Sequence, residues 1–63
     1  MVMVHLPNGL TALAPAGTVE EMLLVLGLNP YEILVTCNGE LLLEDDVVED
    51  DQVLETTSIV HGG

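Results

Sequence analysis

The sequence contains no lysine and no arginine, although eleven of its 63 residues are aspartate or glutamate, and its formal net charge is −11 at pH 7. Without basic side chains the chain cannot neutralise phosphate groups. This argues against binding to nucleic acids and to anionic membrane surfaces. A protein partner is expected to present a basic face, because complementary electrostatic fields speed encounter.

Cysteine and aromatic residues are almost as scarce. Cys37 is the single cysteine, so no internal disulfide forms, and a lone thiol agrees with a reducing cytoplasm. Tyr31 is the single aromatic residue, so the core is expected to consist of aliphatic side chains. The longest apolar stretch, residues 22–28, is far shorter than the roughly 20 residues of a membrane-spanning helix. The N-terminus also lacks the basic region of a signal peptide. We therefore expect a cytoplasmic protein.

Apolar residues make up 49% of the chain, which is enough for a packed core. At this length the chain forms one domain of limited stability. We expect a folded domain over residues 1–60, followed by a flexible tail over residues 61–63.

Hydrophobic patterning predicts the order hairpin, helix, hairpin, strand. Apolar alternation and turn residues predict strands at residues 1–6, 10–14, 32–37, 40–43 and from 52 or 53 to 60. Turns are expected at residues 7–9 and at Asn38-Gly39, and residues 44–52 are expected to form an acidic loop with a small apolar insert.

The predicted helix begins after Thr18, which has capping-box spacing to Glu21, and ends at Gly27. Its buried face follows the i, i+3, i+4, i+7 series Val19, Met22, Leu23 and Leu26. Two hairpins and one helix predict an α+β fold in which the helix packs across one face of a sheet of four to five strands.

Four segments taken in order resemble the ThiS/MoaD family of ubiquitin-like sulfur carriers. They are Thr18-Val19, Val35-Thr36-Cys37-Asn38-Gly39-Glu40, Glu49-Asp50-Asp51-Gln52-Val53 and Val60-His61-Gly62-Gly63. The resemblance covers the whole chain, and the length suits the ThiS branch. It implies a β-grasp fold with a mixed sheet, in which the first and last strands pair in parallel at the centre. Archaeal small ubiquitin-like modifiers share the pattern.

The chain departs from the family in one turn. Members often have Asp-Gly-Asp before the last strand, where this chain has Asp50-Asp51-Gln52. An aspartate occupies a left-handed conformation at some cost, so we expect the turn to persist with altered geometry.

The resemblance also implies a function for the C-terminus. An ATP-dependent adenylyltransferase of the ThiF/MoeB type would adenylate the Gly63 carboxylate, which would then become a thiocarboxylate. Gly62 and His61 would thread the enzyme's channel, since glycine has no Cβ to obstruct a narrow passage. Because the sequence ends at Gly63, no protease is expected to be needed.

The sulfur would pass to an accepting synthase, such as a thiazole synthase in thiamin biosynthesis, or to molybdopterin formation or tRNA thiolation. In this interpretation the protein is a monomeric cosubstrate and not an enzyme. It binds no cofactor, and the ATP belongs to the partner.

Two other functions remain open. The chain is a protein modifier if Gly63 forms an isopeptide bond with target lysines, and an interaction module if the tail is inert. The absence of lysine suits a modifier that avoids building chains on itself. It suits a carrier equally, because a reactive acyl group then meets no internal side-chain amine.

The remaining candidate residues concern binding and packing. Alternation leaves Leu34, Leu41, Leu43 and Met3 as a predicted partner-binding surface on the sheet face opposite the helix. Cys37 is in phase with Val35 and Ile33, which predicts a buried, inert thiol. No residues have metal-ligand spacing or form a nucleophile–base pair, so neither a metal site nor a catalytic residue is predicted.

Overall fold

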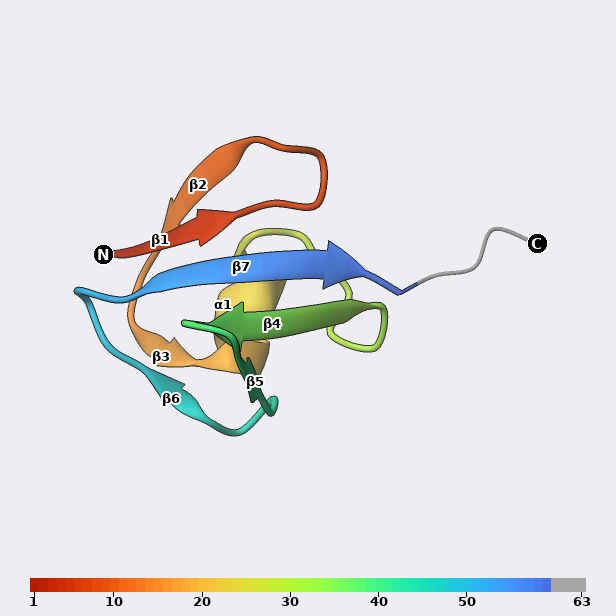
Figure 1. Cartoon of the computed structure of the whole chain (residues 1–63). Helices are drawn as coiled ribbons and strands as arrows, with labels where there is room; N and C mark the ends of the chain where they lie inside the picture. The colour runs from red at the N-terminus through yellow and green to blue at the C-terminus, as the bar shows by residue number, and fades with distance from the viewer. Residues whose placement is uncertain (60–63) are drawn as a thin grey trace.

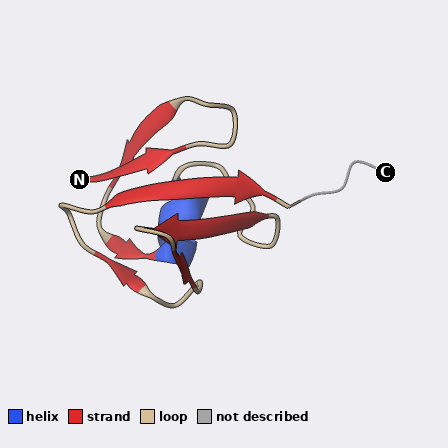
Figure 2. Ribbon diagram, in the orientation of Figure 1, coloured by secondary structure: helices blue, strands red, loops and turns tan. Residues whose placement is uncertain are grey.

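The computed structural model describes residues 1–59, so the predicted tail residues His61, Gly62 and Gly63 lie outside the described residues. The protein has an α+β fold. One helix, α1 (Val19–Val25), packs on one face of a mixed five-stranded sheet and leaves the other face open (Figures 1 and 2). No helix within residues 1–59 is long and apolar enough to cross a membrane.

The large sheet has the strand order β2-β1-β7-β4-β5. Its members are β1 (Val2–His5), β2 (Thr11–Ala14), β4 (Ile33–Cys37), β5 (Glu40–Leu42) and β7 (Val53–Ser58). β1 and β7 run parallel at the centre, whereas the other neighbouring pairs are antiparallel. The predicted order of hairpin, helix, hairpin and strand is thus confirmed, as is the parallel pairing of the first and last strands.

The two hairpins close as their turn residues predict. Asn38 and Gly39 have φ angles of 53° and 82°, as a two-residue type I′ turn requires. In the first hairpin, the Leu10 N–H donates to Oδ1 of Asn8 at 3.0 Å, and Gly9 has a φ of 89°. These turn conformations fix the register of the strands that flank each turn.

Helix α1 is short, and side-chain or backbone hydrogen bonds satisfy both of its ends. Thr18 and Glu21 form the predicted capping box, in which each side chain accepts a hydrogen bond from the other residue's backbone N–H. At the other end, Gly27 adopts a φ of 76° and donates to Leu24, while Leu28 donates to Leu23 at 2.8 Å. These two hydrogen bonds form a Schellman motif, which explains why the helix ends at the predicted glycine.

The core lies between α1 and the inner sheet face. No aromatic residue belongs to it, as the scarcity of aromatics predicts. Its members are Val2, Val4, Ala14, Val19, Met22, Leu23, Val35, Cys37, Val48 and Leu54. Each of the larger side chains contributes about 1.5–3 kcal/mol by burial. Leu26, also predicted to be buried, is half-buried and packs against this cluster.

The expectation of a loop over residues 44–52 was wrong for two of them. β6 (Val47–Val48) pairs with β3 (Gly17–Thr18) in a small second sheet, and Val48 is fully buried. Strands of two residues are too short to show alternation, so the pattern could not reveal them. The turn before β7 persists as expected, and the Gln52 N–H donates to the Glu49 carbonyl at 3.1 Å. Neither of its aspartates is left-handed, however, since Asn38 is the one residue besides glycine with a positive φ among residues 1–59.

The capping box makes helix stability depend on pH. Hydrogen bonds from the Thr18 backbone N–H and then the Thr18 hydroxyl hold the pKa of the Glu21 carboxyl below its usual value of 4.5. A lowered folded-state pKa means that the stabilisation is present above pH 4.5 and is lost as the pH falls through the folded pKa. The free energy of unfolding of the wild type should therefore exceed that of Glu21→Gln at pH 7, and the difference should shrink in acid.

Denaturant titration of both proteins across this pH range measures the difference. Glu20→Gln is the matched control, because it removes the same charge from the same helical turn outside the capping box. A Glu21→Gln difference that stays constant with pH would contradict the role of the ionised carboxylate.

Candidate functional site

Ile59, the last residue that the structure describes, is fixed to the sheet. β7 lies between β1 and β4, and the Ile59 N–H, which follows it, donates to the Glu32 carbonyl at 2.9 Å. Because β1 and β7 are parallel, Ile59 lies at the end of β7 far from the N-terminus (Figure 1). The Met1 ammonium is 3.4 Å from Oδ1 of Asp50, at the start of the turn into β7. The Met1 α-amino group, in a chain without lysine, is therefore remote from Ile59.

The sheet face opposite α1 carries exposed apolar side chains. Three of the four predicted binding residues, Leu34, Leu41 and Leu43, are exposed and line a single hollow of about 440 Å³ beside β4 and β5. Glu44 and Asp45 also line this hollow, so two carboxylates lie next to its apolar surface. We call this surface the Leu41 hollow, and it offers an apolar contact with an acidic border.

The Leu41 hollow lies beside the end of β7. Two of its lining residues, Ile33 and Leu34, pair with Ser58 and Thr57 of β7, immediately before Ile59. Any partner seated in the hollow therefore lies close to the point where the described chain ends.

Met3, the fourth predicted binding residue, is exposed but is not part of this hollow. It pairs with Leu13 on one side and with Val53 on the other, and both of these are also exposed. Sequence alternation marks Leu13 and Val53 as outward-facing, but without strand order their proximity to Met3 was not evident. The open face thus carries two separate apolar groups.

A polar row separates these two groups across the sheet. Strand register aligns Thr11, His5, Glu55 and Thr36 in this row, and the row ends at Leu41 of the hollow. Nδ1 of His5 lies 3.2 Å from Oγ1 of Thr11. His5 is half-buried within this row.

Cys37 is part of the core, as its phase with Val35 predicted. It is 8% exposed, and Nε2 of Gln52 donates to its sulfur at 3.5 Å. A buried cysteine of this kind acts as a small apolar side chain. Residues 1–59 also contain no group of three or more histidine, cysteine, aspartate or glutamate side chains placed to hold a metal ion.

Burial of Cys37 predicts slow alkylation. A maleimide reagent should modify native protein at least about tenfold more slowly than denatured protein, because the thiol becomes accessible only on opening. Mass spectrometry over time measures both rates. Equal rates in the two states would show that the thiol is accessible in the folded protein and would contradict its structural role.

Comparison with known proteins leaves the family of this chain open. The sequence matches no protein-family model, and it matches no curated protein at a significant level.

Proposed function

We propose that this protein is a sulfur carrier with a β-grasp fold, whose working group is the Gly63 carboxylate. The observation that carries the proposal is the central parallel pairing of β1 with β7 in a mixed sheet covered by one helix. This topology is the one that the resemblance to ThiS/MoaD proteins implies. It also brings the last described residue, Ile59, beside the Leu41 hollow.

The chemistry follows from the weak electrophilicity of a carboxylate. One oxygen of the Gly63 carboxylate attacks the α-phosphorus of ATP, a P–O bond forms and pyrophosphate leaves. The resulting acyl adenylate has AMP as a good leaving group. A hydrosulfide ion then attacks the carbonyl carbon, the bond to AMP breaks, and Gly63 carries a thiocarboxylate. The adenylyltransferase binds the ATP, and the carrier contributes the reacting group.

The Leu41 hollow is the proposed docking surface for this adenylyltransferase. Its leucines offer apolar contact area, and Glu44 and Asp45 favour a basic rim on the partner. A net charge of −11 would steer a basic partner toward the carrier. Docking next to Ile59 would hold the following residues within reach of the partner's ATP site.

Adenylation is measured by carrier-dependent exchange of pyrophosphate into ATP. A ThiF/MoeB-type adenylyltransferase that activates its own carrier should catalyse this exchange with the wild-type protein. Deletion of Gly62 and Gly63 should reduce the exchange to background, because the C-terminal carboxylate then belongs to His61, which is two residues shorter in reach and carries a side chain. Exchange at the wild-type rate after this deletion would refute the assignment of Gly63.

The docking surface is tested by a matched pair of substitutions in the same assay. Leu41 and Leu13 are 56% and 58% exposed, and both lie on the open sheet face. Leu41→Asp should raise the KM for the carrier about tenfold, which corresponds to about 1.4 kcal/mol of lost binding. Leu13→Asp, which adds the same charge outside the Leu41 hollow, should change it much less. Equal effects of the two substitutions would locate docking elsewhere.

A further inference from the structure

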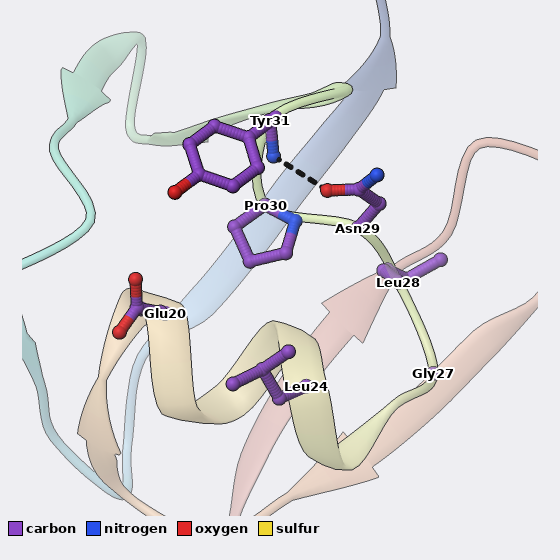
Figure 3. A pocket seen from close by; sticks show the side chains of 7 residues that line it. All are labelled: Glu20, Leu24, Gly27, Leu28, Asn29, Pro30 and Tyr31. Carbon is purple, nitrogen blue, oxygen red and sulfur yellow. Dashed lines mark hydrogen bonds between the residues drawn. The ribbon is translucent and has the colours of Figure 1, made fainter.

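A second hollow lies on the helix side of the molecule, where α1 ends and the loop before β4 begins. It has a volume of about 600 Å³. Figure 3 shows Leu24 on the helix opposite the rings of Pro30 and Tyr31, with Glu20 at one end and Leu28 toward the other. We call this surface, lined by Glu20, Leu24, Leu28, Pro30 and Tyr31, the Tyr31 groove.

The groove exposes apolar groups that the core does not use. Tyr31 is the single aromatic residue of the chain, yet its side chain is 82% exposed. Leu24, on the outer side of α1, is also exposed. A protein whose core contains no aromatic side chain has therefore left its single aromatic ring at the surface, beside an exposed leucine. Exposed apolar surface gathered in a hollow is typical of interaction sites, and tyrosine is enriched among the residues that dominate binding energy.

The loop that presents Tyr31 is held by local hydrogen bonds. Oδ1 of Asn29 accepts a hydrogen bond from the Tyr31 N–H at 3.0 Å, and the Asn29 carbonyl accepts one from the Glu32 N–H at 2.9 Å. The ring of Pro30 fixes φ within this turn. At the other side of the groove, the Schellman motif at Gly27 holds the end of α1. A surface organised in this way loses little conformational entropy on binding.

Charge determines what kind of segment fits. Glu20 is the one charged residue lining the groove, and the chain contains no lysine or arginine to pair with it. The Glu20 N–H donates to the Glu44 carbonyl at 2.9 Å, which brings the acidic segment at Glu44 and Asp45 beside the same end of the groove. The field at this end is therefore negative, and an occupant must supply the cation.

We propose that the Tyr31 groove binds a segment of a partner protein that inserts an apolar side chain between Leu24 and Tyr31 and places an arginine against Glu20. Arginine fits better than lysine, because its planar guanidinium pairs with a carboxylate through two hydrogen bonds and stacks on a tyrosine ring. The groove is of a size that holds one or two side chains. This interaction does not depend on the sulfur-carrier function, since it does not use the C-terminal residues. The Tyr31 groove and the Leu41 hollow share Pro30, and the acidic segment at Glu44 and Asp45 borders both surfaces.

The probe for this proposal is the peptide acetyl-Leu-Gly-Arg-amide, titrated into isotope-labelled protein and followed by NMR. Saturable shifts at millimolar peptide are expected for the amides of Gly27, Leu28 and Tyr31. Acetyl-Leu-Gly-Glu-amide and acetyl-Gly-Gly-Arg-amide should bind at least about fivefold more weakly, because each lacks one of the two contacts. Equal binding of the Gly-Gly-Arg peptide would show that net charge alone attracts the probe, and would overturn the proposal.

Matched substitutions locate the binding site. Leu24→Ser and Tyr31→Ala should each weaken binding of the peptide about tenfold, whereas Leu10→Ser should leave it unchanged, because Leu10 is 63% exposed, close to the 60% of Leu24, but lies in the first hairpin turn. Glu20→Gln should weaken binding more than Glu49→Gln, which removes the same charge outside the groove. Equal effects within either pair, or no saturable shift with the folded wild-type protein, would refute the proposal.

Discussion

The parallel pairing of β1 with β7 is the constraint on which the rest of the structure depends. It joins segments about fifty residues apart, and Oγ1 of Thr56 reinforces it by donating to the His5 carbonyl at 2.6 Å. The pairing puts the last strand at the centre of the sheet, with Leu54 buried beneath it. Because closing so long a loop costs conformational entropy, this pairing is expected to form late in folding. The two local hairpins can form before it.

The charged side chains contribute little to the stability of the fold, and they border the two surfaces proposed for recognition. Among residues 1–59 the Met1–Asp50 contact is the one ion pair, so the fold is held by apolar burial and by backbone hydrogen bonds. The acidic side chains remain on the surface, and both the Leu41 hollow and the Tyr31 groove have carboxylates at their borders. Proximity of like charges opposes folding slightly and is screened by salt. The same field favours basic partners at either surface.

The sequence predicted most of the local structure because local signals carry it. Asn38-Gly39 specifies its turn, and Thr18 with Glu21 specifies the start of α1 through contacts three residues apart. Features that depend on long-range pairing were harder to predict. The β3–β6 pair was missed because each strand has two residues, and Met3 was grouped with Leu41 because strand order decides which outward-facing residues are neighbours. The Tyr31 groove was also missed, since it forms between a helix end and a loop.

The proposed conversion of Gly63 to a thiocarboxylate is tested most directly by the intact mass of the protein. The protein is incubated with ATP, a sulfide or persulfide source and a ThiF/MoeB-type adenylyltransferase that converts its own carrier under the same conditions. We expect a mass gain equal to the replacement of one oxygen by one sulfur, located at Gly63 by fragmentation. An unchanged mass with this active enzyme would contradict the carrier function.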